Sequence, residues 1–93
     1  MDRQIIYTHK RGNHFNAHER ILGVAAPSWY RTEAQVITEI RAKLNSYFVS
    51  VGGRRVNVII AQHQGRPYIK TEADGYEPNN LLALPEPPPG LLP

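Results

Sequence analysis

The chain has 93 residues, of which 41% are hydrophobic, and it contains no cysteine. This length allows one small globular domain, and the missing thiols exclude disulfide bridges, thiolate zinc sites and cysteine nucleophiles. The formal net charge is +3, yet every lysine and arginine lies at or before Lys70, so the basic body could meet a polyanion, or the acidic stretch over 71–93 could fold back over it.

Two strands are predicted before residue 27. Residues 4–9 (QIIYTH) are rich in β-branched and aromatic types, and residues 20–26 (RILGVAA) form a second apolar run. We expect an antiparallel pair joined by a long polar loop over 10–19. Gly23 interrupts the second run, and a glycine inside a strand is typical of a bulge or of a close backbone approach.

One amphipathic helix is predicted after Pro27 and Ser28. Thr32 and Gln35 have the spacing of a capping box, in which the threonine hydroxyl and the glutamine side chain each satisfy a free backbone amide. Apolar residues then recur at helical spacing until Asn45. Because a helix of about three turns cannot bury such a stripe alone, it must lie on a sheet. The stripe consists of Val36, Ile37, Ile40 and Leu44.

Two hairpins are predicted after the helix. Residues 47–60 (YFVSVGGRRVNVII) are two alternating runs around Gly52 and Gly53, which supply the positive φ angles of a type I′ turn. A two-residue loop pairs Val49 with Val56 on a core face, and it pairs Ser50 with Arg55 on a solvent face. Residues 66–71 (RPYIKT) form a third run across 61–65. Because proline has no amide hydrogen to donate, Pro67 predicts either an edge strand or a strand that Pro67 begins.

These elements predict an α+β fold, a meandering antiparallel sheet of about five strands with one helix packed on a face. The domain is expected over 4–86, with a single helical turn capped by Asn79 or Asn80 and a flexible proline-rich tail over 87–93. Trp29 and Tyr30, just ahead of the helix, are either core anchors or an exposed aromatic patch, and we expect them to anchor the core. Most of the core is expected from Val36, Ile37, Ile40, Leu44, Tyr47, Val49, Val56, Val58 and Ile60.

The residues offer little for catalysis or metal binding. His9, His14 and His18 could hold a metal ion if they shared a helix, but the glycine and asparagines among them favour a polar loop, so no metal site is predicted. No nucleophile motif, carboxylate pair or phosphate-binding loop is present. We therefore expect a protein that is not an enzyme, with no catalytic residue and no cofactor.

No segment is apolar for long enough to predict a secretory signal or a transmembrane helix. Together with the absence of cysteine, this favours the cytoplasm and no membrane contact.

Two kinds of partner remain open. The favoured interpretation is a protein–protein interaction module, monomeric or weakly dimeric, because an edge strand invites strand addition and a proline-rich tail can dock as a short segment. The alternative is weak nucleic-acid binding through the basic hairpins, with aromatic rings that stack on bases, although edge strands also carry cations merely to prevent association. The candidate nucleic-acid-binding residues are Arg54, Arg55, Arg66, Tyr68 and Lys70.

Several short motifs carry a resemblance to a known family. These are the aromatic-Ile-Lys-Thr run at Tyr68–Thr71, the Asp-Gly pair at 74–75 and the Asn-Leu-Leu-x-Leu-Pro sequence at 80–85. With the order of the preceding elements, they resemble the small bacterial domain-of-unknown-function family numbered 3892, over about residues 4–86. The resemblance implies the domain boundaries and the fold, and it implies no catalytic residue. The long loop at 10–19 and the PPPGLLP tail depart from the bare family pattern.

Overall fold

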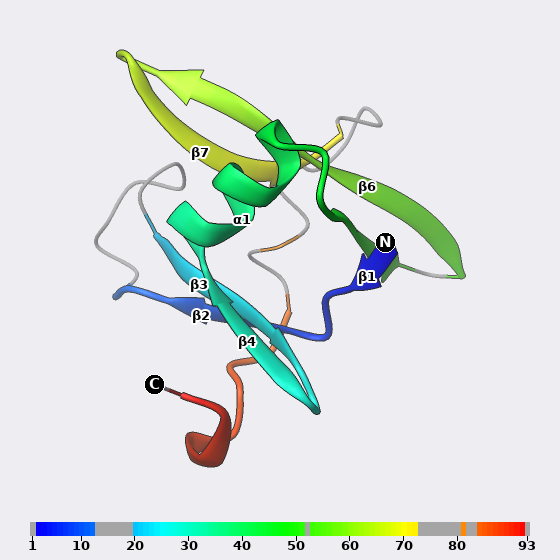
Figure 1. Cartoon of the computed structure of the whole chain (residues 1–93). Helices are drawn as coiled ribbons and strands as arrows, with labels where there is room; N and C mark the ends of the chain where they lie inside the picture. The colour runs from blue at the N-terminus through cyan, green and yellow to red at the C-terminus, as the bar shows by residue number, and fades with distance from the viewer. Residues whose placement is uncertain (1, 13–19, 52, 73–80, 82–83, 93) are drawn as a thin grey trace.

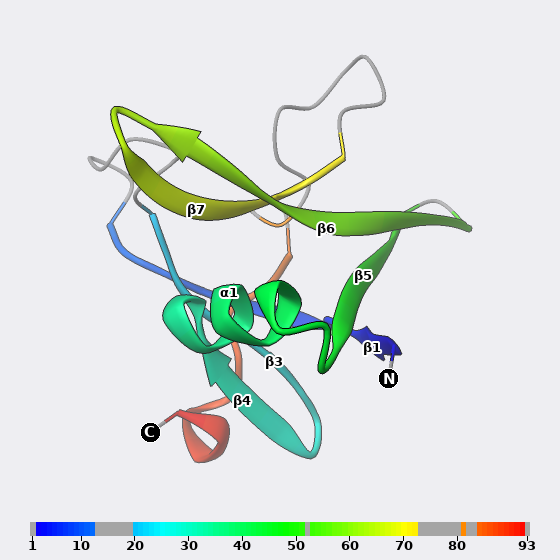
Figure 2. The same cartoon turned by 45° about the horizontal axis from the view of Figure 1, so that its top comes forward.

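The computed structural model of the chain describes residues 2–12, 20–51, 53–72, 81 and 84–92, and over these residues it has two β-sheets and one α-helix (Figure 1). The four-stranded sheet has the order β1 (Asp2–Gln4), β5 (Ser46–Val51), β6 (Arg54–His63), β7 (Arg66–Thr71). The three-stranded sheet has the order β2 (Tyr7–Lys10), β3 (Ile21–Ala26), β4 (Trp29–Thr32). Helix α1 (Glu33–Arg41) contacts strands of both sheets (Figures 1 and 2). The predicted α+β class is confirmed.

The strands do not form the single meander that the sequence suggested. The first predicted strand is divided into β1 and β2, and β1 pairs with β5 in parallel. The amide of Ile5 donates to the Phe48 carbonyl in one sheet, while the amide of Ile6 donates to the Ala25 carbonyl in the other. The chain therefore crosses between the sheets at these two isoleucines, and an unbroken apolar run conceals the crossing.

Residues 29–32 form a strand that the sequence did not predict. β4 pairs with β3 around a two-residue turn at Pro27 and Ser28. Trp29 packs against the core as expected, with its ring centroid 5.8 Å from that of Tyr47. The expectation for Tyr30 was wrong, because its half-buried side chain bonds to His9, with 2.8 Å between the hydroxyl oxygen and Nδ1.

The helix begins as predicted and ends early. The Thr32 hydroxyl accepts from the Gln35 amide, and the Gln35 side chain accepts from the Thr32 amide, which confirms the capping box. The helix ends at Arg41, and Lys43 has a φ of 58°, a left-handed conformation that stops a helix. Leu44 therefore lies beyond the helix and is 64% exposed, so its assignment to the core was wrong.

Both predicted hairpins are present. Val49 pairs with Val56 and Ser50 with Arg55, as the Gly-Gly turn predicted. In the second hairpin His63 pairs with Arg66, so the turn is limited to Gln64 and Gly65. Their φ angles are 51° and 80°, which is the type I′ pattern.

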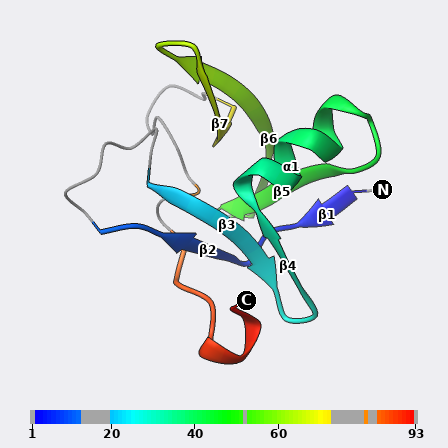
Figure 3. The same ribbon diagram turned by 60° about the vertical axis from the view of Figure 1, so that its left-hand side comes forward.

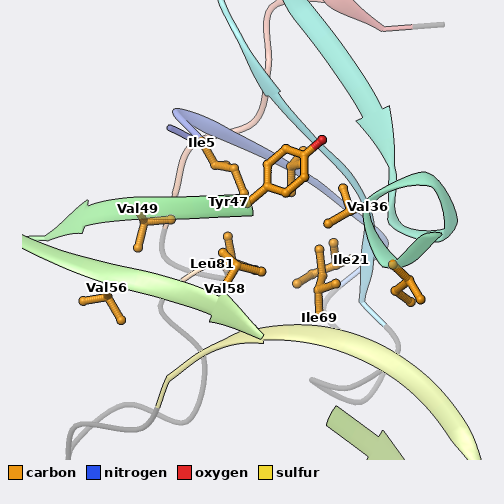
Figure 4. Packing of buried hydrophobic residues seen from close by; sticks show 11 residues of the cluster. Ile5, Ile21, Val36, Tyr47, Val49, Val56, Val58, Ile69 and Leu81 are labelled. Atoms are coloured by element: carbon orange, nitrogen blue, oxygen red, sulfur yellow. The ribbon is translucent and has the colours of Figure 1, made fainter. Parts of the chain in front are cut away.

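The core lies where the helix and both sheets meet. Figure 4 shows Ile5, Val36, Tyr47, Ile69 and Leu81 approaching one another from different parts of the chain. Ile40 and Ile60 are only partly buried against this cluster. The predicted cap at Asn79 or Asn80 lies outside the described residues. The buried cluster consists of Ile5, Ile21, Val24, Val36, Ile37, Tyr47, Val49, Val56, Val58, Ile69 and Leu81.

The last residues of the chain run past β2 and end in the short 3-10 helix η2 (Pro89–Leu91) (Figure 3). The carbonyl of Pro85 accepts from the Thr8 amide at 3.0 Å. Glu86 lies 3.4 Å from the Lys10 ammonium, so part of the acidic stretch does fold back onto the basic body. In the described part of the chain, no helix is long and apolar enough to cross a membrane.

Candidate functional site

The side of the four-stranded sheet that faces away from the core carries most of the predicted binding residues. Along β6, Val56 and Val58 are buried while Arg55, Asn57 and Ile59 are exposed. Residues paired directly across a sheet share one side, so neighbouring strands add to this surface. We call it the outer face: Phe48, Ser50, Arg55, Asn57, Ile59, Tyr68 and Lys70.

Arg55 is held in place on the outer face. Its guanidinium carbon lies 4.2 Å from the centre of the Phe48 ring, a cation–π contact. Nη2 donates to Asp2 at 2.8 Å and Nε donates to Asn57 at 3.2 Å. The hydrogen bonds from Ser46 and Arg55 lower the pKa of Asp2 below its ordinary value. Arg55 therefore points to solvent as predicted, but its charge already has a partner.

Arg66 reaches the start of the helix. Its Nη2 donates to Glu33 Oε1 at 3.2 Å, and the amide of Ile69 donates to Glu33 Oε2 at 3.3 Å. Burial raises the pKa of Glu33, and the bonds from Ile69 and Arg66 oppose that rise. The pair thus ties β7 to α1, so Arg66 has a structural partner in the fold.

The same contact covers part of the free edge of β7. The Glu72 amide donates to Asn57, and ladder bonds alternate along an antiparallel pair. The amides of residues 67, 69 and 71 therefore point away from β6. Pro67 has no amide hydrogen and the Ile69 amide is bound to Glu33. An incoming strand would find few free donors on this edge.

The other predicted residues are divided between the two sides of the sheet. Tyr68 and Lys70 are half-buried on the outer face, opposite Ala61 and Ile59. Lys70 makes no ion pair with any residue that the structure describes. Arg54 is exposed beside the turn, where strand alternation places it on the opposite side from Arg55. Alternation places Arg66 on the same side as Tyr68 and Lys70, so Arg54 is the candidate that lies apart and the five do not form one basic patch.

The predicted binding residues did not include three contributors to this surface, which are Phe48, Ile59 and Asp2. Phe48 and Ile59 were identifiable from strand alternation, which places them beside Arg55. Asp2 was not identifiable, because it is 53 positions away from Arg55 in the chain. Only the parallel pairing of β1 with β5 brings it there.

Two other places in the fold carry polar or titratable groups. His9 bonds to Tyr30, His14 and His18 lie outside the described residues, and the residues that are described contain no group of three or more potential metal ligands. A shallow, open depression over the exposed side of α1 is lined by Ala34, Gln35, Thr38 and Glu39. The Glu39 carboxylate there accepts from Arg31, Asn45 and Tyr47, so it is used within the fold.

Comparison with known proteins identifies a family. The model of a family described as Protein of unknown function (DUF3892) matches residues 4–85. Neither a curated protein nor a solved structure matches the chain.

Proposed function

The chain belongs to the DUF3892 family of proteins of unknown function, and since that family brings no activity with it, we propose a function from the outer face: a non-enzymatic module that binds another protein there. The observation that carries the proposal is the composition of this face. It presents Phe48 beneath Arg55, together with Ile59 and Tyr68. Aromatic residues and arginine are enriched at protein interfaces and supply most of their binding energy.

The charges on this face favour a protein over a polyanion. Arg55 is paired with Asp2, and Arg66 is paired with Glu33. A phosphate backbone gains most from cations that are free to replace its counterions. Binding of a protein partner costs less side-chain entropy, because an arginine held over an aromatic ring is already ordered before contact. The proposed compartment is the cytoplasm, which a cysteine-free chain suits.

Nucleic-acid binding is the second candidate. Phe48 with Arg55 stacked on it, and Tyr68 near Lys70, combine rings and cations as single-strand binding surfaces do. In this case affinity for an oligonucleotide would fall steeply with salt and would depend on Lys70.

A comparison of matched variants tests the proposal. Ile59→Thr/Lys70→Thr changes the outer face and keeps strand-favouring side chains, while Gln62→Thr changes an exposed residue of β6 on the opposite side. Each tagged full chain is used for affinity capture from cells that express it natively. We expect wild type and Gln62→Thr to retain a common partner protein. The double variant should retain at least about fivefold less of it, which corresponds to roughly 1 kcal/mol of binding free energy.

Two further measurements identify the kind of partner. Sedimentation over a concentration series would identify a second copy as the partner if a dimer formed and the double variant abolished it. Titration of single- and double-stranded oligonucleotides at two salt concentrations addresses the alternative. Salt-sensitive binding that the double variant loses, without a captured protein, would replace the proposal. Equal capture by all three chains, or by none, would refute it.

A further inference from the structure

The edge of β2 carries a second surface, which is distinct from the outer face. Two of its amides point away from β3, and residues near the end of the chain occupy both. The Thr8 amide donates to the Pro85 carbonyl at 3.0 Å. The Lys10 amide donates to the Glu86 carboxylate, 3.3 Å from Oε1 and 3.1 Å from Oε2. We call this edge, with the Lys10 side chain, the β2 seat.

The β2 seat selects its occupant by charge. The Lys10 side chain is only 12% exposed, and its ammonium donates to the Leu84 carbonyl and lies 3.4 Å from Glu86. A nearly buried ammonium is costly unless an anion and hydrogen-bond acceptors compensate it. An occupant therefore needs a carboxylate at the position of Glu86.

The present occupant also shows what shape fits. Leu84 packs against the core and Pro87 is buried. The seat therefore covers an apolar side chain two residues before the Glu86 carboxylate and a proline ring directly after it. Pro88 has φ −59° and ψ 150°, the polyproline II conformation, which needs no internal hydrogen bonds. An extended, proline-flanked acidic segment already has this shape, so it loses little conformational entropy when it binds.

The segment that fills the seat can be displaced. Leu81 is fully buried, so it can anchor the chain when Leu84–Pro87 leave the seat. Glu86 is 51% exposed, which means that water reaches the carboxylate that closes the contact. A segment from another chain can compete once it exceeds the effective concentration of the tethered one, which is about millimolar for short tethers.

We propose that the β2 seat is a binding site for extended, proline-flanked acidic segments of partner proteins, and that the chain's own Leu84–Pro87 fills it in the absence of a partner. Binding adds no chemistry and uses backbone amides for affinity and Lys10 for specificity. The seat lies on the other sheet from the outer face, so either site can fail without the other.

A peptide titration tests the proposal on the full chain. The probe is a fluorescent peptide of residues 81–92 (LLALPEPPPGLL). Glu86→Lys in the protein sets two cations against each other and weakens the tethered occupant. We expect the wild-type peptide to bind this variant at least about tenfold more tightly than it binds wild-type protein. Glu86→Gln should give a smaller gain in the same direction, and it keeps the test open if the lysine variant does not fold.

A charge swap between Lys10 and Glu86 distinguishes binding at this site from nonspecific binding. Full-length Lys10→Glu should prefer a peptide carrying Glu86→Lys over the wild-type peptide, and Glu86→Lys protein should prefer the reverse. Backbone NMR should show the bound peptide at the Thr8 and Lys10 amides and leave Val49 unchanged. No binding to either Glu86 variant, with the fold intact by NMR, would overturn the proposal. Equal binding of both peptides would overturn it as well.

Discussion

At the scale of single residues, close approaches fix how the three-stranded sheet packs. A Cβ atom at Gly23 would meet the Tyr30 hydroxyl and would lie 2.7 Å from the Arg31 carbonyl oxygen. Real side chains do not tolerate such distances, so the glycine leaves room for the tyrosine to cross the sheet towards His9. The close backbone approach predicted at Gly23 is confirmed, while the irregularity in pairing lies on β2, between His9 and Lys10.

Gly23→Ala should lower the free energy of unfolding by about 1–3 kcal/mol, as overpacking usually does. The measurement is urea unfolding followed by circular dichroism. Gly90→Ala is the control, because a Cβ there meets nothing within 4 Å. Equal stability of Gly23→Ala and wild type would mean that Tyr30 does not lie across the glycine.

A second residue-scale feature is the Glu39 carboxylate, which links α1 to β5. It accepts from Arg31 at 3.1 Å, from Asn45 at 2.9 Å and from the Tyr47 hydroxyl. Burial acts to raise its pKa, but the bonds from Tyr47, Asn45 and Arg31 together lower the pKa of Glu39 below its usual 4.5. Burial and the hydrogen bond to Glu39 raise the pKa of the Tyr47 hydroxyl.

The sign of this shift gives a pH prediction. A carboxyl group with a lowered pKa in the folded state stabilises above its unfolded pKa, and that stability is lost as pH falls through the folded value. Glu39→Gln should therefore cost about 1–3 kcal/mol at neutral pH, and its difference from wild type should shrink below pH 4.5. Denaturant unfolding at both pH values measures this, with the exposed Glu72→Gln as the control. A deficit that did not change with pH would contradict the assignment.

At the scale of elements, the two hairpins explain how much the sequence could reveal. Turn glycines and strict alternation made the β5–β6 register predictable, and it is as expected. The division of the first strand was not predictable, because Ile5 and Ile6 are both apolar and local pattern does not record which sheet each amide joins. β4 was missed for a similar reason: its residues are mostly half-buried and show no alternation.

The candidate site was only partly predictable at this scale. Arg55 could be placed on the solvent side from the hairpin alone. Its partner Asp2, and the partner Glu33 of Arg66, lie on other elements, so the neutralisation of both arginines depends on tertiary packing. Charge counted along the sequence therefore overstated the basic character of the hairpins.

The β6–β7 turn supports a prediction about stability. Gln64 has a φ of 51°, a left-handed conformation that disfavours most side chains and that asparagine tolerates. Gln64→Asn should raise the free energy of unfolding by about 0.5–1 kcal/mol. Thermal unfolding compares it with Gln62→Asn, the same change at an extended position of β6, which should give no gain. Lower stability for Gln64→Asn would show that the turn has a different conformation.

At the scale of the whole molecule, the fold covers parts of its sheet edges and pairs several of its charges within the chain. The β2 edge is occupied by residues 85 and 86, and the β7 edge is bound in part by Glu33. Such covering limits edge-to-edge association at these two edges, and a folded partner protein is proposed to bind at the outer face, separately from any extended segment that displaces Leu84–Pro87 from the β2 seat. The favoured interaction is therefore face-on, and the strand addition first considered at β7 has fewer donors to use.

The most direct test of that central claim places a photo-crosslinking amino acid at Ile59, on the outer face, and separately at Thr38, over the depression on α1. Both positions are exposed, so neither change should disturb the core. Irradiation of cells that express the full chain should give a covalent adduct with a protein from position 59 and none from position 38. Adducts from position 38 alone, or adducts from position 59 only to nucleic acid, would contradict protein binding at the outer face.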